Sequence, residues 1–509
     1  MTSIKSSVKS PIRLSLLMAL FVLGLAACND FLTTPPQGLI GEDAVRNDPA
    51  AAQNLVTGVY NSLWEESMHG FDFVGMTNIA SDDADKGSSA ADGANTFGTL
   101  DNLNPTAGVG NLNNLWSAYF RSIAKANQAL ALIPLSAAEP TVRRQLEGEV
   151  RFLRAYFYFN LVRFFGGVPL LDAIPAVDQV NNTDLQKRAT REQVYDLIVR
   201  DLRYAANVLP IKGQTQTGRA TKAAAMAMLA KVYLYQKNWQ QAYTLSDSIV
   251  KNQVGSYDLL PNYANIWRET GANSVESLFE VQTGINLSCN AAINLYVVCQ
   301  GPRAGGKRGW SDLGFGFGTP SQSLVDEYEA NDQRRAATII FINPAPRGTV
   351  LWDGFRVPSR DSVENDRYNY KAYHSRTAER NCGNNDRLPK NLRIMRLGEV
   401  LLIHAEAALA TGQNAAALTD INRLRTRAGL PALTTLDRAA VWHERRVELA
   451  MEHDRFFDLI RQEDVQAGRA VQAFAAHGKT FTKGKNEVFP IPQNQIQLSG
   501  GALTQNPGY

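Results

Sequence analysis

Apolar residues recur every three or four positions over much of the chain, which is the period of an amphipathic helix. In the clearest stretch, Val150, Leu153, Phe157, Leu161 and Phe164 form a single apolar stripe. The same period predicts helices at residues 49–64, 115–133, 141–165, 191–208, 222–235, 239–250, 396–410, 414–427 and 441–461. We therefore expect a mainly α-helical protein.

Two pairs of these helices are joined by tight turns. Residues 222–235 and 239–250 span roughly 30 residues together, as a tetratricopeptide hairpin does, and residues 396–410 and 414–427 form a second such pair. Small residues such as Ala223 would let paired helices approach closely. The predicted fold is an α-α superhelix of tetratricopeptide-like hairpins.

The helical pattern is interrupted twice. Residues 65–110 are polar and rich in Gly, Asn and Asp, so we expect a long loop that buries little surface. Residues 257–390 lose strong helical patterns and gain Gly, Asn, Pro and aromatic residues, which predicts a loop-rich, irregular insert. Long loops in compact domains often carry function.

The first 27 residues are typical of a signal peptide. Lys5, Lys9 and Arg13 precede an apolar run at residues 14–27, which is shorter than the about 20 residues that a membrane-spanning helix needs. The run ends in Leu25-Ala26-Ala27-Cys28, which resembles a lipobox and predicts lipidation of Cys28. The alternative is an ordinary secretory signal followed by a chance cysteine.

These patterns give a provisional domain plan. We expect a signal peptide at 1–27, a lipidated extended tether at 28–48, an N-terminal helical region at 49–256, a loop-rich binding insert at 257–390 and a C-terminal helical region at 391–509.

The charge balance argues against two classes of partner. The chain has 52 basic and 49 acidic residues, and removing the three basic residues of the signal peptide leaves 49 of each. A balanced mature chain argues against nucleic acid as a partner and against a polybasic membrane surface.

No catalytic or metal-binding motif is complete. His443-Glu444 begins like a zinc-protease helix, but Val447 stands where the second histidine is needed. Asp82, Asp83 and Asp85 match a calcium loop poorly because Gly87 falls one place early. We expect no enzyme, no metal and no cofactor.

Two features of polar chemistry remain. Glu444, Glu448, Glu452 and Arg455 are spaced to lie on one face of a helix. This spacing favours a charged network between helices over a glycosidase acid pair, because a glycosidase needs its carboxylates on opposite sides of the sugar bond.

Cysteines 289, 299 and 382 fit no metal pattern, and a disulfide between Cys289 and Cys299 is as plausible as two free thiols.

Seven blocks, in order along the chain, resemble the SusD/RagB family of outer-membrane lipoproteins, and the start CNDFLTTPP resembles the lipidated start of that family. The blocks are EVRFLRAYFYFNLVRFFGGVPL (149–170), RATKAAAMAMLAKVYLY (219–235), LGEVLLIHAEAALATG (397–412), INRLRTRAGL (421–430), ERRVELAMEHDRFFDLIR (444–461), VFPIP (488–492) and QNPGY (505–509).

The resemblance implies a tetratricopeptide-like fold on the outer face of a Gram-negative outer membrane, held there by the lipid. It also implies a SusC-like TonB-dependent transporter as partner, to which the protein delivers a glycan or another nutrient without catalysis. The alternative is a tetratricopeptide-type scaffold that binds a protein partner and no small molecule.

Contact residues are sought in the two loop-rich regions, because sugar rings stack on aromatic side chains and their hydroxyls bond to Asp, Asn and Arg. The candidates are Trp64, Phe71, Asp72, Asp82, Asn95 and Phe97 in the first region, and Tyr296, Arg303, Trp310, Asp312 and Trp352 in the second.

Overall fold

The computed structural model describes residues 41–179, 182–283, 295–303, 314–380 and 388–509. Cys28, Cys289, Cys382, Trp310 and Asp312 lie outside these residues, so the predictions made for them are not addressed by the fold.

The N-terminal half is built around one long buried helix, α8 (Pro140–Phe165), which α7 (Gly110–Leu132) and α9 (Arg191–Val208) flank. From Gly148 to Phe165 nearly every side chain of α8 is buried. The helix ends at Gly166, whose φ of +73° suits a residue without a Cβ atom. Two earlier helices, α2 (Glu42–Asn47) and α3 (Pro49–Asn61), complete this layer.

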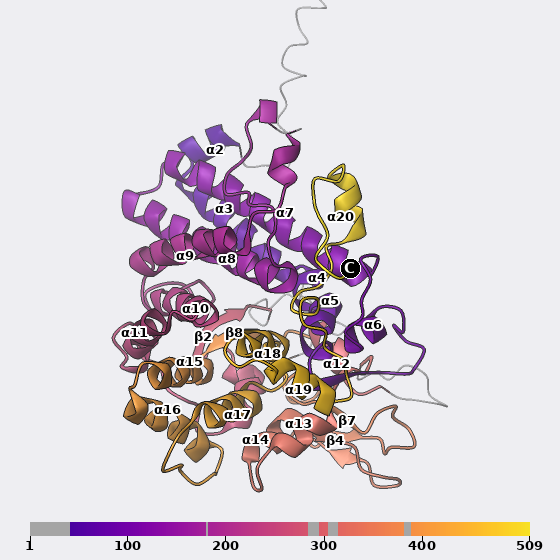
Figure 1. Ribbon diagram of the computed structural model, residues 1–509. Coiled ribbons are helices and arrows are strands. Elements are labelled where there is room, and N and C mark those ends of the chain that lie inside the picture. The colour runs from indigo at the N-terminus through magenta and orange to yellow at the C-terminus, as the bar shows by residue number, and fades with distance from the viewer. Residues whose placement is uncertain (1–40, 180–181, 284–294, 304–313, 381–387) are drawn as a thin grey trace, which may run out of the picture.

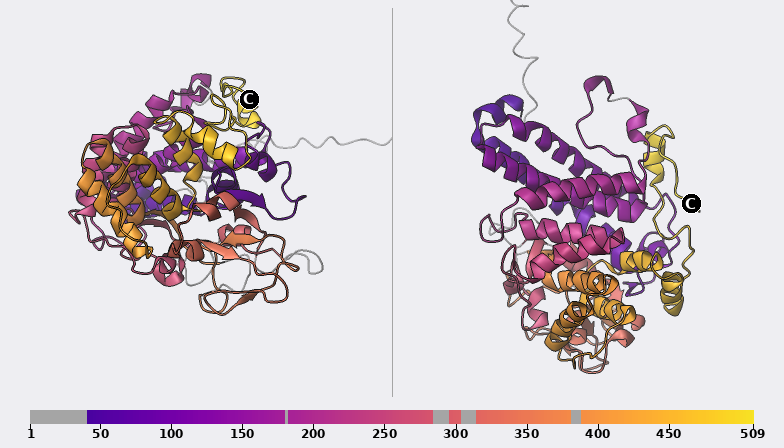
Figure 2. Two further views of the ribbon diagram at one scale, coloured as in Figure 1. Left: turned by 60° about the horizontal axis from the view of Figure 1, so that its bottom comes forward. Right: turned by 60° about the vertical axis from the view of Figure 1, so that its left-hand side comes forward.

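Both predicted helical hairpins are present. The first consists of α10 (Lys222–Tyr235) and α11 (Trp239–Val250), and the second of α15 (Leu397–Ala410) and α16 (Asn414–Arg427). Helix α11 packs on α15, so the two hairpins are neighbours although about 150 residues separate them in sequence. Figure 2 shows the helices stacked from the indigo N-terminal ones to the orange hairpin. The predicted tetratricopeptide-like helical fold is confirmed.

Short strands occur among the irregular segments. In the described part of the chain they form two-stranded antiparallel sheets that pair β1 with β3, β2 with β8, β4 with β7 and β5 with β6. The strands are β1 (Ala84–Gly87), β2 (Ser277–Val281), β3 (Phe317–Pro320), β4 (Ile339–Phe341), β5 (Thr349–Val350), β6 (Arg356–Val357), β7 (Arg367–Asn369) and β8 (Leu392–Arg396).

The remaining α-helices lie at the right and at the bottom of Figure 1. They are α4 (Glu66–His69), α5 (Phe71–Val74), α6 (Phe97–Asp101), α12 (Tyr296–Gln300), α13 (Gln322–Glu327), α14 (Gln333–Thr338), α17 (Arg438–Leu449), α18 (Arg455–Glu463), α19 (Arg469–Ala476) and α20 (Gln493–Leu498). Single turns of tighter or wider helix are η1 (Ser62–Trp64), η2 (Gly75–Ile79), η3 (Ile133–Leu135), η4 (Val177–Gln179), η5 (Thr183–Gln186), η6 (Tyr263–Trp267) and η7 (Glu269–Gly271).

The prediction for residues 65–110 was wrong. The segment forms α4, α5, η2, β1 and α6, and from Phe73 to Ala84 it is buried. Its polar residues are buried because distant arginines pair with them: Arg455 bonds to Asp82 at 2.7 Å and Arg446 bonds to Asp83 at 2.8 Å. A carboxylate paired in this way tolerates the loss of water.

The single helix predicted at 441–461 was also wrong, because residues 450–454 separate α17 from α18. Met451 and His453 adopt positive φ angles of 64° and 74° there, which end the helix. The break turns Glu452 and Asp454 toward different partners: Glu452 bonds to Arg396 on β8, and Asp454 bonds to α8 and α10.

The predicted charged network between helices is confirmed. Glu448 on α17 pairs with Arg396, Arg427 and Arg334, and all four side chains are almost completely buried. These guanidinium groups hold the pKa of Glu448 well below its usual range despite burial.

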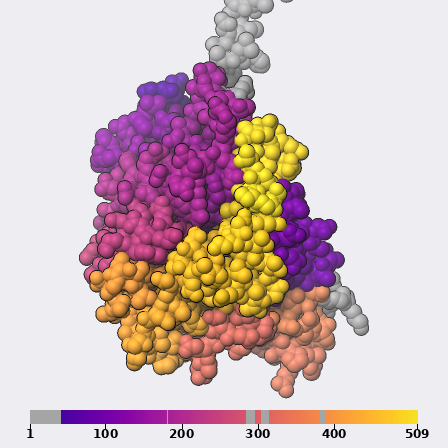
Figure 3. All heavy atoms as spheres, in the orientation of Figure 1, coloured from indigo at the N-terminus to yellow at the C-terminus, as the bar shows by residue number. Residues whose placement is uncertain are grey.

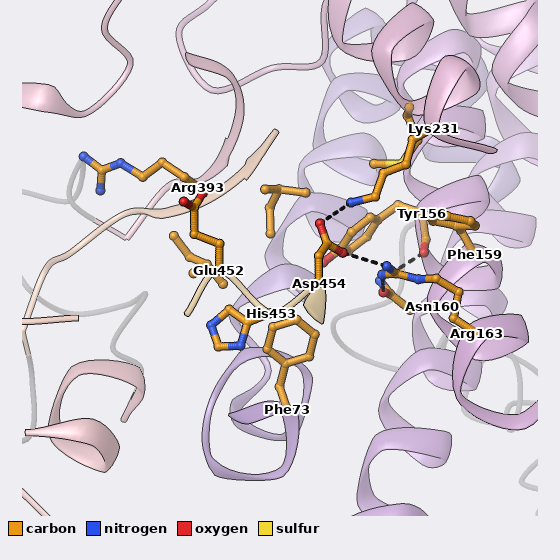
Figure 4. Close-up of a pocket in the computed structure, with 13 residues that line it drawn as sticks. Phe73, Tyr156, Phe159, Asn160, Arg163, Lys231, Arg393, Glu452, His453 and Asp454 are labelled. Atoms are coloured by element: carbon orange, nitrogen blue, oxygen red, sulfur yellow. Dashed lines mark hydrogen bonds and ion pairs between the residues drawn. The ribbon is translucent and has the colours of Figure 1, made fainter. Parts of the chain in front are cut away.

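Asp454 is the meeting point of three helices. Its carboxylate accepts from Arg163 on α8 at 2.9 Å and from Lys231 on α10 at 2.5 Å, as Figure 4 shows. The segment after α18 then runs back along the surface to the N-terminal helices (Figure 3), where the Phe489 N–H donates to the Phe164 carbonyl at 2.7 Å. Among the described helices, none combines the length and the apolarity needed to cross a membrane.

Replacing Asp454 with Asn should destabilise the fold by about 3–5 kcal/mol, because Arg163 and Lys231 would keep buried charges with less compensation. Urea unfolding measures the loss. The matched control is Asp184→Asn, which removes an exposed pair with Lys187 and should cost about 0.5 kcal/mol or less. Equal effects of the two substitutions would contradict a structural role for the buried pairs.

Acid should destabilise the fold through two buried histidines. Burial lowers the pKa of His453 to about 3 and that of His69 to about 4. Below the unfolded value of about 6.5 the unfolded chain binds protons that the folded chain excludes, so stability falls as the pH falls. Each histidine should contribute a loss of about 1.4 kcal/mol per pH unit between about pH 6 and pH 4.

Urea unfolding across this pH range checks the slope. The substitution His453→Gln should reduce the slope of stability against pH by about 1.4 kcal/mol per pH unit, which corresponds to one proton. An unchanged slope would show that His453 does not contribute to the acid sensitivity.

Candidate functional site

Four phenylalanine rings gather on the loop-rich side of the molecule. Phe71 lies 5.3 Å from Phe315 and 5.8 Å from Phe317, and Phe97 lies 4.7 Å from Phe317, all between ring centroids. Phe71 and Phe315 are half-buried, whereas Phe97 and Phe317 are buried. We call these four residues the aromatic cluster.

The cluster depends on a close approach of α6 to η2. A Cβ atom at Gly75 would lie 2.8 Å from the Phe97 ring, which is too close for a real contact. The missing side chain at Gly75 therefore lets Phe97 settle beneath Phe317 and support the exposed edge of the cluster.

Residues 86–95, which we call the polar loop, border the aromatic cluster. The Lys86 amino group donates to the carbonyls of Gly87, Ser89 and Asp92 at 2.9, 2.7 and 3.0 Å. One cation therefore holds three carbonyls of this turn. It also lies 5.9 Å from the centroid of the Phe317 ring. Burial lowers the pKa of Lys86.

Arg303 ties the polar loop to the insert. Its guanidinium donates to the Ser88 hydroxyl at 2.5 Å and to the Ser89 hydroxyl at 3.3 Å, and it forms an ion pair with Asp92. The Asn365 amide donates to the Ser88 carbonyl at 3.3 Å from the other side. The loop is thus held in one conformation with its charges paired.

Two acids lie next to the cluster in sequence. Asp72 accepts from the Asn111 amide at 2.6 Å, and Glu66 accepts from the Leu295 N–H at 3.1 Å. Burial raises the pKa of both carboxyl groups. These contacts anchor α4 and α5 to α7 and to the residue just before α12 in the insert.

The structure therefore brings five of the sequence-predicted residues together. Phe71, Phe97 and Arg303 form or border the aromatic cluster, Asp72 supports it, and Asn95 is exposed on the polar loop two residues before Phe97.

Other predicted residues lie elsewhere. Tyr296 is buried, with its hydroxyl 3.0 Å from His453 Nε2, and Asp82 is buried in its pairs with Arg455 and Arg446, so both belong to the scaffold. Trp352 is 42% exposed and carries the Arg268 guanidinium 4.4 Å above its ring. Trp64 lines a different hollow, together with Gln216 and Gln282.

Some residues at this site were missed from the sequence. Phe315 and Phe317 alternate with glycines in GFGFGT (314–319), which lies in the insert, and neither was among the candidate contact residues. The alternation could have indicated them, because a period of two residues is typical of a strand. In the structure, β3 places Phe317 beside Gly87 of β1. Cys299 is buried, and its suggested partner Cys289 lies outside the described residues.

A small cavity near the helix break has no room for a ligand. Its volume is about 30 Å³, and Phe73, His453, Asp454 and Arg163 are among the residues that line it (Figure 4). That space suits one or two water molecules. Within the described ranges, no group of three or more His, Cys, Asp or Glu side chains is placed to hold a metal ion.

Two family models match successive parts of the chain. Residues 275–509 match the family model described as SusD family, and residues 42–234 match the model described as starch-binding associating with outer membrane. SusD-like protein P2 of Formosa agariphila is 28% identical, over 96% of this chain and 98% of its own length. The starch-binding protein SusD of Bacteroides thetaiotaomicron is 23% identical, over 71% of this chain and 72% of its own.

Solved structures show the same fold. A laminarin-binding SusD-like protein superposes with a TM-score of 0.75 at 29% identity and covers 90% of this chain and 99% of its own. Surface glycan-binding protein A from Bacteroides fluxus gives a TM-score of 0.76 at 25% identity, covering 91% and 100%. Because the two family models match successive parts of the chain and the fold agrees over 90% of it, the chain belongs to the SusD/RagB family.

Proposed function

We propose that this protein is a surface-exposed lipoprotein that binds a glycan or oligosaccharide and delivers it to a SusC-like TonB-dependent transporter of the outer membrane. The observation that carries the proposal is the aromatic cluster beside the polar loop: half-buried Phe71 and Phe315 next to Ser88 and Ser89, which Arg303 holds in place.

The chemistry of this face suits a neutral sugar. The C–H face of a sugar ring packs against an aromatic ring, while its hydroxyl groups exchange hydrogen bonds with serine, amide and backbone groups. Arg303 is paired with Asp92, and carbonyls surround the Lys86 amino group. A charged ligand would gain little from charges that are already compensated.

The names of relatives support a glycan. One similar solved protein is described as laminarin-binding, and the family model over residues 42–234 is described as starch-binding. The cluster lies on short helices and a strand outside the long scaffold helices, which suits a binding role that varies among members of one fold.

Binding without catalysis is part of the proposal. Glu444 and Glu448, the carboxylates spaced like a possible acid pair, are both bonded to Arg334 and buried in the scaffold. Incubation with an oligosaccharide should give a complex and no product. A tetratricopeptide-type protein scaffold is the alternative, and such a scaffold would not bind any oligosaccharide.

The proposed location is the outer face of the outer membrane, with the lipid on Cys28 as anchor. Support comes from the lipobox-like sequence before Cys28 and from the family description, which associates such proteins with the outer membrane.

The aromatic cluster can be tested by titration calorimetry of the mature chain with laminarihexaose and maltohexaose. Phe71→Ala should weaken binding of the preferred oligosaccharide about tenfold, because a stacking surface is lost. The matched control is Phe120→Ala, which removes a half-buried ring that packs on Trp116 of α7. If both variants bind like the wild-type protein, the cluster is not the site.

The lipid anchor can be tested by substitution of the modified residue. In a Gram-negative host, Cys28→Ser should move the protein from the membrane fraction to the soluble fraction and abolish labelling by a radioactive fatty acid. A Ser3→Ala substitution near the start of the predicted signal peptide should change neither property. Continued fatty-acid labelling of the Cys28→Ser protein would contradict lipidation at this residue.

A further inference from the structure

Two adjoining hollows lie on the surface between the end of α3, the loop before α10 and strand β2. Their volumes are about 210 and 190 Å³. The residues that line both hollows are Gln216, Thr217, Gly218, Arg219, Glu280 and Gln282. The hollows therefore form one groove, which shares no residue with the aromatic cluster or the polar loop.

One wall of the groove is aromatic. Tyr60 and Trp64 are four residues apart across α3 and η1, so they lie on the same side of the helical turn. The Tyr60 hydroxyl accepts from the Ala220 N–H at 2.8 Å, and the Arg219 guanidinium lies 5.4 Å from its ring centroid, which fixes this residue in the wall. Trp64 is half-buried, and among the described residues no other ring or cation stacks on its indole.

The opposite wall is built from amides. Gln282 and Asn273 exchange hydrogen bonds of 2.8 and 2.9 Å, and the Asn391 amide also donates to Gln282 at 3.2 Å. The Gln282 amide also donates to the Glu280 carbonyl at 3.2 Å, so its hydrogen bonds are all made within the protein and it forms a fixed, neutral wall. Gln216 and Thr217 are exposed at the rim.

The charges of the groove are compensated from within the protein. Arg219 bonds to the buried carboxylate of Glu149 at 2.8 Å. Glu280 accepts from the Asn273 N–H at 3.1 Å and from the Asn391 amide at 2.8 Å. The amino group of Lys212, which also lines the groove, donates to the carbonyls of Ser274 and Ser277 at 2.5 and 2.8 Å. These charged groups are already bonded within the protein, whereas a neutral ligand with many hydroxyl groups fits an indole facing amides.

Gly218 keeps the groove open. Its φ is +92°, and a Cβ atom there would lie 2.5 Å from Cγ of Gln282. Any side chain at this position would push Gln282 out of the wall and fill the space between the two hollows.

We propose that this groove is a second carbohydrate-binding subsite, in which Trp64 stacks on a neutral sugar ring, Gln216 and Thr217 at the rim bond to its hydroxyl groups, and Gln282 forms the facing wall. The inference rests on the proposed function, because it assigns a second contact for the same class of ligand. It predicts that one glycan chain, or two separate oligosaccharides, contact the protein at two places.

Calorimetric titration of the mature chain with laminarihexaose, maltohexaose and polymeric laminarin tests the groove. Trp64→Ala should weaken the binding of at least one probe about tenfold. The control is Trp239→Ala, which removes a half-buried tryptophan at the start of α11. The length of α10, about 20 Å, separates this residue from the groove. That variant should bind like the wild-type protein.

Hydrogen exchange of the wild-type protein gives a second measurement that needs no substitution. Saturation with the bound probe should slow exchange in residues 212–221 and 277–282, in addition to any protection of residues 84–97. The same readout keeps the test decisive if Trp64→Ala fails to fold.

The outcomes separate the two proposals. If Phe71→Ala weakens binding while Trp64→Ala does not, and protection is confined to residues 84–97, the groove is not a subsite and the proposed function stands. If the wild-type protein binds none of the probes, both proposals are overturned. Protection of residues 212–221 together with weaker binding by Trp64→Ala establishes the subsite.

Discussion

Pairing of buried charges between distant segments is the constraint on which this fold depends. At residues 450–454 the chain leaves α17 and places Glu452 against Arg396 and Asp454 against Arg163 and Lys231. Removing one partner from such a pair costs more than the pair contributes, because the remaining charge stays buried. The network therefore fixes the geometry of α8, α10, β8 and α18 more strongly than it adds to their stability.

The proposed sites inherit their positions from this constraint. The break that directs Asp454 also sets His453 against the Phe73 ring of α5, at 4.7 Å, and against the hydroxyl of Tyr296 on α12. Helix α5 carries Phe71, and α12 leads into Arg303. The aromatic cluster is thus placed on a buried, packed base, which lowers the entropy cost of binding a ligand there.

Periodicity predicted the long helices because each buries one face against a neighbour, so its apolar residues recur every three or four positions. Periodicity failed where the conformation of a residue depends on a partner that is distant in sequence. Asp82 and Asp83 look like loop residues until Arg455 and Arg446 bury them, and Glu452 continues the helical spacing of Glu448 although the helix has ended. For the site, aromatic residues in loops indicated Phe71 and Phe97, but only the pairing of β1 with β3 brings Phe317 to them.

Two modest sites on one rigid scaffold suit a polymer better than one strong site. Trp64 and Phe71 are separated by a short segment whose Met68, His69 and Gly70 are buried, so the groove and the aromatic cluster keep a fixed relation. Once a chain of sugar rings occupies one site, the local concentration of its remaining rings at the other is high, and avidity exceeds either affinity. Each contact can then remain weak enough to release quickly, which suits the proposed delivery to a transporter better than a single tight site does.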